Sequence, residues 1–294
     1  MQVNIDIHTF EFKGEKKFDI QKTPTQIPDF YRDKDHYKNL MEEFQEEIDE
    51  LQTMMYAHDR YALLLIFQAM DAAGKDGTIQ KVMSGINPHG VDIYSFKKPS
   101  DSELDHDFLW RTTVAFPQRG KIGIFNRSYY EEVLVVKVHP EILTRYQRLP
   151  AELVIDPEEV WKQRYEDIRN LEKYAYRNGI RVVKFFLNIS KDEQRKRFLS
   201  RLNEPDKNWK FAEADVKERS YWDKYMEAYQ SCINATATPE APWYVIPADD
   251  KNNMRLIVAK VILAQMEELD MKFPAVDEAR KAEFQKFREM LEKD

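Results

Sequence analysis

Apolar residues recur every three or four positions between residues 35 and 58, and this spacing predicts an amphipathic helix. The next segment, residues 61–68, is a short continuous apolar run, which is typical of a strand buried on both faces of a parallel sheet. Residues 1–34 follow neither pattern and are predicted to form an irregular arm. The apolar face of the helix is made of Leu40, Phe44, Ile48, Leu51 and Met55.

Strand-like and helix-like segments alternate along the rest of the chain. After residues 61–68, four more strands are predicted, at residues 90–96, 121–126, 180–189 and 243–246. Helices are predicted at residues 78–84, 100–114, 128–138, 156–179, 190–202, 213–231 and 249–269. Five strands separated by helices predict an α/β fold built on a doubly wound, parallel five-stranded sheet.

The length of 294 residues suits one large α/β domain with extensions. We predict an N-terminal arm and helix (residues 1–58), a core (59–250) and C-terminal helices (251–294). Residues 191–220, inside the core, are predicted to form a lid.

Composition narrows the functional classes. With 43% hydrophobic and 33% charged residues, no apolar run long enough to cross a membrane and no basic-then-apolar start, we expect a cytoplasmic protein without a membrane partner. The single cysteine, Cys232, cannot form an internal disulfide, which also favours the cytoplasm. The net charge of −7 argues against a nucleic-acid partner, because non-specific nucleic-acid binding needs a basic surface.

The segment "IFQAMDAAGKDGTI" after the first core strand resembles a phosphate-binding loop. The template G-x-x-x-x-G-K-[ST] is met at Gly74 and Lys75, whereas Ala69 and Asp76 depart from it. Backbone N–H groups of the loop would surround phosphate oxygens, and the helix N-terminus would add positive charge. An ordinary strand-to-helix turn is the alternative. The predicted phosphate-binding residues are Ala72, Ala73, Gly74, Lys75, Asp76, Gly77 and Thr78.

Two carboxylates in this loop suggest a metal ion. Mg²⁺ prefers carboxylate and phosphate oxygens together, so an acid in the loop would replace the missing hydroxyl ligand. Asp71 is the predicted metal ligand because it precedes the glycine bend. Asp76 either contributes to the phosphate site or caps the following helix.

Polar residues also follow the strand at residues 121–126. Asn126 and Arg127 lie at its carboxyl end, where open α/β sheets bind ligands, and Glu131 follows one turn later. The guanidinium of Arg127 would suit a pair of bidentate hydrogen bonds to phosphate. The alternative is that Asn126 and Ser128 only cap a helix while Arg127 pairs with a surface acid.

The segment "QRKRFLSRLNEPDKNWKF" places Arg197 and Arg201 four residues apart on one helical face. Phosphoryl transfer needs cations on the migrating group and a lid that excludes water, and this helix and loop would supply both. A solvated charged helix is the alternative reading of the same cluster.

Together these segments resemble the polyphosphate kinase 2 family. "MDAAGKDGTI", "DHDFLWR", "GIFNRSYYEEVLV", "RKRFLSRLNEPDKNWKF" and "APWYVIPADDK" are similar to its recurring motifs, from about Arg32 to Leu269. "FNRSYYEE" resembles the class III pattern, in which Asn126 replaces the Asp of the wider family. The resemblance implies a P-loop kinase-like fold of thymidylate-kinase type with a helical lid, and reversible phosphate transfer between inorganic polyphosphate and nucleotides.

The resemblance also implies cofactors, partners and residue roles. It implies Mg²⁺, with Mn²⁺ as an alternative, conversion of AMP to ADP and then ATP, use of adenine or guanine nucleotides, and assembly as homodimers or homotetramers. By residue, Asp71 and Lys75 are the loop's charged pair, Arg127 holds phosphate, and Glu131 or Glu132 selects the nucleotide or positions metal. The predicted catalytic residues are Asp71, Lys75, Asn126, Arg127 and Glu131, and Arg197 and Arg201 are predicted lid arginines.

An acidic protein that binds a polyanion needs a local basic groove. The residues predicted to line it are Lys75, Arg119, Lys121, Arg127, Lys137, Arg197 and Arg201. Two other functions remain open from the sequence. One is an ATP-dependent nucleoside monophosphate kinase with the same fold, and the other is a non-catalytic scaffold that binds nucleotide or polyphosphate.

Overall fold

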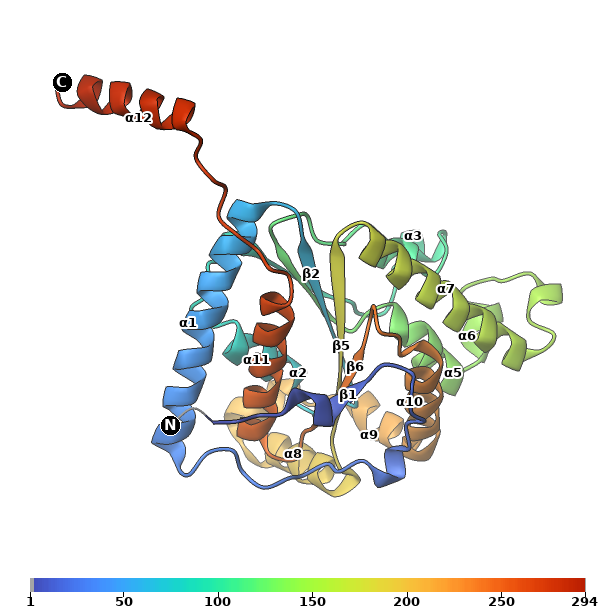
Figure 1. Ribbon diagram of the computed structural model, residues 1–294. Coiled ribbons are helices and arrows are strands. Elements are labelled where there is room, and N and C mark those ends of the chain that lie inside the picture. Colours follow the sequence, from blue (N-terminus) through green and yellow to red (C-terminus); the bar gives the residue numbers. More distant parts are fainter. Residues whose placement is uncertain (1–2, 294) are drawn as a thin grey trace.

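A single mixed β-sheet organises the chain (Figure 1). The computed structural model describes residues 3–293, apart from the side chain of Lys210. Within these residues the sheet has six strands in the order β1-β6-β5-β2-β4-β3. The strands are β1 (Glu11–Phe12), β2 (Ala62–Ala69), β3 (Val91–Ser95), β4 (Ile122–Asn126), β5 (Ile180–Asn188) and β6 (Trp243–Pro247).

The five strands predicted from the sequence are confirmed, and they run parallel to one another. The prediction that residues 1–34 form an irregular arm is wrong at β1. This short strand pairs with β6 in the antiparallel direction and forms the edge of the sheet. Only Glu11 and Phe12 pair, with Tyr244 and Trp243. Two residues are too few to produce an alternating pattern that a sequence window would detect.

Helices cover both faces of the sheet (Figure 1). On one side lie α1 (Lys34–His58), α2 (Lys75–Val82) and α11 (Lys251–Glu267), and on the other α5 (Val135–Val138), α7 (Pro157–Arg177) and α10 (Trp222–Thr236). The remaining α-helices are α3 (Asp101–Leu104), α4 (Trp110–Thr113), α6 (Glu141–Arg145), α8 (Lys191–Asn203), α9 (Glu213–Arg219) and α12 (Glu278–Leu291). The 3₁₀ helices are η1 (Ile7–Phe10), η2 (Ile20–Lys22), η3 (Pro88–Gly90), η4 (Tyr129–Val133), η5 (Ala151–Leu153) and η6 (Pro205–Lys210).

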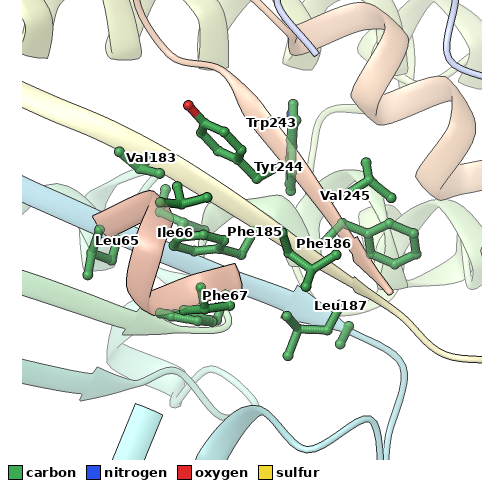
Figure 2. Close-up of a cluster of buried hydrophobic side chains, with 14 of the residues drawn as sticks. Leu65, Ile66, Phe67, Val183, Phe185, Phe186, Leu187, Trp243, Tyr244 and Val245 are labelled. Atoms are coloured by element: carbon green, nitrogen blue, oxygen red, sulfur yellow. The ribbon is translucent and has the colours of Figure 1, made fainter. Parts of the chain in front are cut away.

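The core lies along β2, β5 and β6. Every residue of β2 is buried, which explains its continuous apolar run. Figure 2 shows Phe67 of β2 close to Phe185 of β5, and their rings stack with centroids 4.8 Å apart. This packing fixes the carboxyl ends of the parallel strands, where the loops described below begin.

Three predicted helices are each divided in two by local hydrogen bonds or packing. Between α3 and α4, the Asp107 carboxylate accepts from the backbone N–H of Leu109 at 2.9 Å. Between α9 and α10, the Ser220 hydroxyl donates to the Lys217 carbonyl at 2.7 Å. Such side chains compete with helical hydrogen bonds, so they shorten helices that periodicity alone extends. The helix predicted at residues 128–138 is η4 followed by α5.

The C-terminal segment leaves the body of the molecule. α12 projects away from the sheet and its helices (Figure 1), and each of its residues is exposed. None of the described helices has the length and apolar character needed to span a membrane.

Candidate active site

The loop after β2 has the shape of a phosphate-binding turn without the first glycine. Ala69 is the last residue of β2 and does not have a positive φ, so a Cβ is tolerated there, as the sequence required. The left-handed positions are Ala72 (φ 61°) and Gly74 (φ 105°). A non-glycine residue at positive φ stores strain of roughly 1–3 kcal/mol, and such strain concentrates at functional sites.

Lys75 begins α2 and folds back over the loop. Its Nζ donates to the Ala69 carbonyl at 2.8 Å. Desolvation lowers the pKa of the Lys75 ammonium, and the nearby Arg127 adds to that lowering. Lys75 therefore places a cation at the N-terminus of α2, beside the backbone N–H groups of the turn.

Asp71 and Arg127 come from neighbouring strands and meet. Arg127 Nη2 lies 3.1 Å from Asp71 Oδ1, and Arg127 Nη1 lies 3.8 Å from Glu131 Oε2. The charge of Glu131, followed by that of Asp71, raises the pKa of the Arg127 guanidinium, while burial raises the pKa of Glu131. Arg127 therefore pairs with two site acids and not with a surface acid, the alternative considered from the sequence.

Asn126 connects the ends of β3 and β4 to α2. Its Nδ2 donates to Asp76 Oδ1 at 2.6 Å and lies 3.5 Å from the Ser95 hydroxyl. Asp76 is inside the first turn of α2, and Gly74 precedes the helix. Of the two roles considered for Asp76, helix capping is therefore wrong, because its carboxylate accepts from Asn126 and not from a backbone N–H.

The two predicted lid arginines have different environments. Arg197 is buried on α8, and its Nη1 donates to the Ala73 carbonyl at 2.7 Å while its Nη2 donates to the Ala248 carbonyl at 2.7 Å. It fastens α8 to the phosphate loop. Arg201, one turn later, lies 3.2 Å from Asp215 of α9. Direct phosphate contacts by both residues remain predictions.

These elements enclose a cavity of about 570 Å³ at the carboxyl edge of the sheet. Among the described residues, nine basic and three acidic side chains line it, so its charge is strongly positive. The acidic ones are Asp71, Asp76 and Asp215, and the basic ones are Lys75, Lys97, Lys98, Arg127, Arg197, Arg201, Lys207, Lys251 and Arg255.

Four of these basic residues were missed by the sequence reasoning. Lys97 and Lys98 directly follow β3, and Lys251 and Arg255 are one turn apart at the start of α11. Arg255 Nε is buried and has no hydrogen-bond partner among residues 3–293. An unpaired buried donor in a basic cavity favours an anionic ligand, because leaving such a group unsatisfied costs about 1–3 kcal/mol. Their positions in the sequence could have identified them, because they follow strands whose carboxyl ends share one edge of the sheet.

Several predicted residues do not line this cavity. Arg119 and Lys121 precede β4, so they lie at the opposite edge of the sheet, where Arg119 contacts the Asn178 carbonyl and Lys121 pairs with Asp92. Lys137 packs over the Tyr165 ring of α7, with its Nζ 5.7 Å from the ring centroid. Thr78 is buried and contacts the sulfur of Met254. Of the seven cations predicted for the groove, Lys75, Arg127, Arg197 and Arg201 line this cavity, whereas the other three do not.

A magnesium ion is compatible with the donors present. No group of three or more His, Cys, Asp or Glu side chains in the described part of the chain is arranged to hold a metal by itself. Mg²⁺ usually keeps several waters and is held by one or two carboxylates plus substrate phosphates, so it does not require such a group. Asp71 lines the cavity, and its hydrogen bond to Arg127 uses Oδ1, which leaves Oδ2 for a metal ion.

Comparison with known proteins shows which family this chain belongs to. The family model for polyphosphate kinase 2 matches residues 31–274. This chain belongs to the polyphosphate kinase 2 family. The resemblance and the P-loop kinase type of fold predicted from the sequence are thereby confirmed.

Individual relatives of this polyphosphate kinase 2 chain agree with the match. It is 54% identical over 291 residues to the ADP-polyphosphate phosphotransferase of Rhodopseudomonas palustris, covering 97% of this chain and 99% of the relative. It is 42% identical over 232 residues to the AMP/ADP-polyphosphate phosphotransferase of Meiothermus ruber, covering 79% and 82% of the two chains. The crystal structure of polyphosphate kinase 2 from Arthrobacter aurescens superposes with a TM-score of 0.85 at 35% identity, over 96% of this chain and 95% of that one.

Proposed function

We propose that this protein transfers phosphoryl groups between inorganic polyphosphate and AMP or ADP. The observation that carries the proposal is the basic cavity around the phosphate loop, in a chain whose relatives are named for this reaction. A cavity with nine cations among its described lining residues suits a chain of phosphates better than a single neutral substrate. The Asn126 and "YYEE" pattern supports use of both AMP and ADP, as in the class III resemblance.

The proposed step is an in-line displacement. A terminal phosphate oxygen of the nucleotide attacks the end phosphorus of polyphosphate, one P–O bond forms, and the bond to the shortened polyphosphate breaks. Little covalent chemistry is asked of the protein, so catalysis rests on positioning and charge stabilisation. We assign charge stabilisation to Lys75 and Arg127 and orientation of the attacking oxygen to Asp71. Because a phosphoanhydride is both broken and formed, the reaction is expected to be reversible.

We propose that Asp71 holds Mg²⁺, with Mn²⁺ as an alternative. The ion would neutralise phosphate charge at the site of transfer. Asn126 and Asp76, bonded to each other, would keep the start of α2 in register with the end of β4.

The test of the function is donor dependence. The protein is incubated with a divalent metal, polyphosphate and AMP, and the nucleotides are separated over time. ADP followed by ATP is the expected result. Transfer from ATP to AMP without transfer from polyphosphate would instead make this a nucleoside monophosphate kinase. Tight binding without any transfer would make it a scaffold.

Arg255→Met should raise the KM for polyphosphate roughly tenfold, because one charge-assisted hydrogen bond to a phosphate is lost. The KM for AMP should change little. Arg177→Met, the same substitution at an exposed position at the end of α7, is the matched control and should leave both constants unchanged. An unchanged KM for polyphosphate in Arg255→Met would remove this residue from the proposed site.

We also propose that the chain accepts guanine as well as adenine nucleotides.

The chain is further proposed to form homodimers or homotetramers. Exposed apolar side chains on α12, including Phe284, Phe287 and Leu291, support self-association. Sedimentation velocity of the full chain measures the assembly, and the assay above with GMP measures the second substrate. A monomer at micromolar concentration would contradict the first proposal.

A further inference from the structure

The N-terminal arm before α1 is fastened to the rest of the molecule by polar side chains of other elements. In Figure 1 the arm (dark blue) passes through β1, reaches α10 and then crosses back to α1. At α10, Asn234 exchanges two hydrogen bonds with the backbone of Phe18, at 2.8 and 2.9 Å. The match to the family model begins at residue 31, so residues 3–30 lie outside it. The family match therefore assigns no role to this segment.

Residues 23–30 of the arm, called the strap below, pass the ends of β5 and β6. Asn188, the last residue of β5, donates from Nδ2 to the carbonyls of Thr23 and Pro24 at 3.2 and 3.3 Å. Asn253 of α11 accepts from the N–H of Phe30 at 2.9 Å. Both asparagine side chains are buried. They give the strap the hydrogen-bond partners that a strand or helix would otherwise supply, and so hold it in one path.

Asp249 joins the strap to helix α8. Its Oδ2 accepts from the Thr25 hydroxyl at 2.9 Å, and its backbone N–H donates to the Thr25 carbonyl at 2.9 Å. Its Oδ1 accepts from the N–H of Ser190, the N-cap of α8, at 2.7 Å. One carboxylate thus uses both of its oxygens to connect two segments that are far apart in the sequence.

The backbone of Asp249 also holds Arg197 of α8. The Asp249 carbonyl accepts from Arg197 Nη2 at 3.0 Å. Arg197 Nη1 donates to the carbonyls of Ala72 and Ala73 at 3.2 and 2.7 Å. A continuous series of hydrogen bonds therefore runs from Thr25 through Asp249 and Arg197 to the phosphate loop.

The first turn of α8 depends on the Asp249 carboxylate. The first N–H groups of a helix have no partner within the helix, and a negative charge beside them is favourable. The 2.7 Å distance from Ser190 N to Asp249 Oδ1 is that of a charge-assisted hydrogen bond. Helix α8 presents Arg197, Ser200 and Arg201 to the cavity. The position of these three side chains therefore depends on where Asp249 holds the start of the helix.

We propose that Asp249 is a positioning residue for phosphoryl transfer, and that the strap acts through it to hold α8 over the phosphates. Asp249 is not among the described residues that line the cavity, so it would act through α8 and not on the substrate. If α8 shifts, its cations leave the phosphates and water enters the site of transfer. This inference rests on the proposed function, since it names a residue that orders the proposed lid of that reaction.

The first test is Thr25→Val, which removes the hydroxyl and keeps the size of the side chain. The KM for polyphosphate should rise roughly tenfold, because α8 is held by one hydrogen bond to a charged group fewer. Water should also attack the end phosphorus more often in place of the nucleotide oxygen. The share of phosphoryl groups released as orthophosphate should therefore rise several-fold relative to ADP formed. Thr25→Ser keeps a hydroxyl and should behave as the unaltered protein does.

Thr9→Val is the matched control. The Thr9 hydroxyl lies 3.4 Å from Asp6 Oδ2, a contact that stays within the arm on the exposed surface. This variant should leave the KM for polyphosphate and the orthophosphate share unchanged. A merely structural role for Thr25 would reduce the amount of active protein, which lowers kcat and changes neither of the other two quantities. That result in Thr25→Val would overturn the proposal.

The second test is a double-mutant cycle. Asp249→Ala removes the acceptor that Thr25 and Ser190 share, so it should raise the KM and the orthophosphate share more than Thr25→Val does. Thr25→Val added to Asp249→Ala should have no further effect, because the strap would have lost the group through which it acts. Fully additive effects would mean that the strap does not act through Asp249, which would overturn the proposal. If Asp249→Ala does not fold, Thr25→Val decides.

Amide hydrogen exchange separates this proposal from the proposed function, since it needs no turnover. The N–H of Gln194 donates to the Ser190 carbonyl at 3.0 Å in the first turn of α8. In Thr25→Val the amides of this turn should exchange roughly tenfold faster, while those of α7 should not change. Faster exchange without transfer from polyphosphate would keep the role of the strap and reject the function. Transfer from polyphosphate with unchanged exchange in α8 would keep the function and reject the role of the strap.

Discussion

Lys75→Ala should lower kcat for phosphoryl transfer from polyphosphate to AMP by roughly a hundredfold to a thousandfold, the usual cost of removing one group that stabilises transition-state charge. Lys75 lies at the N-terminus of α2, where its ammonium and the turn's N–H groups face the same cavity. Among residues 3–293 its Nζ donates to one acceptor, the Ala69 carbonyl, so its removal should change the free energy of unfolding little. Initial rates at saturating polyphosphate measure the effect.

Lys137→Ala is the matched control for this variant. It makes the same change in a lysine that was predicted to bind phosphate but packs on Tyr165 instead. Its kcat should stay within about twofold of the unaltered protein, because a lysine that packs on the ring of Tyr165 and does not line the cavity contributes little to the transition state. Near-normal turnover in Lys75→Ala would remove the phosphate-loop assignment, whatever the control does.

The sheet could be predicted because its strands are buried on both faces. β2 has eight consecutive buried residues, and a continuous apolar run is the direct consequence. β1 could not be predicted, since its two residues pair with β6 only after the arm has folded across the edge. The division of residues 213–231 into two helices depends on single hydrogen bonds, such as that of Ser220, which periodicity does not register.

The centre of the site was also predictable, and for a topological reason. Asp71 and Arg127 follow parallel strands that are neighbours in the sheet, so their loops must meet at one edge. Arg119 was misplaced because it precedes its strand. A cation eight residues before Arg127 in sequence lies at the opposite edge of the sheet.

The environment of Arg197 could not be inferred from its spacing. The sequence placed it beside Arg201 on one helical face, which suggested two equivalent phosphate contacts. In the structure Arg197 is buried and bonds to backbone carbonyls of the phosphate loop and of the segment after β6. These carbonyls are acceptors that only the folded chain brings together, so Arg197 links α8 to the loop after β2 and to the segment after β6.

Lys184→Met should lower the free energy of unfolding by about 3–5 kcal/mol, the cost of leaving one member of a buried ion pair without its partner. Lys184 Nζ of β5 lies 2.7 Å from Glu172 of α7, and both side chains are fully buried. Burial lowers the pKa of the Lys184 ammonium, and Glu172 opposes that shift. Denaturant unfolding measures the change, with Lys173→Met on the exposed side of α7 as the control, which should stay within about 0.5 kcal/mol.

This ion pair also supports η4, the segment that carries Glu131. The hydroxyls of Tyr129 and Tyr130 donate to Glu172 at 3.0 and 2.7 Å, so the carboxylate that pairs with Lys184 also anchors η4. The double variant Lys184→Met, Glu172→Gln removes both charges and keeps an acceptor for the tyrosines. It should regain more than half of the lost stability, because the unpaired buried charge causes most of the loss. A double variant no more stable than Lys184→Met would mean that Lys184 acts through its bond to the Thr236 carbonyl and not through Glu172.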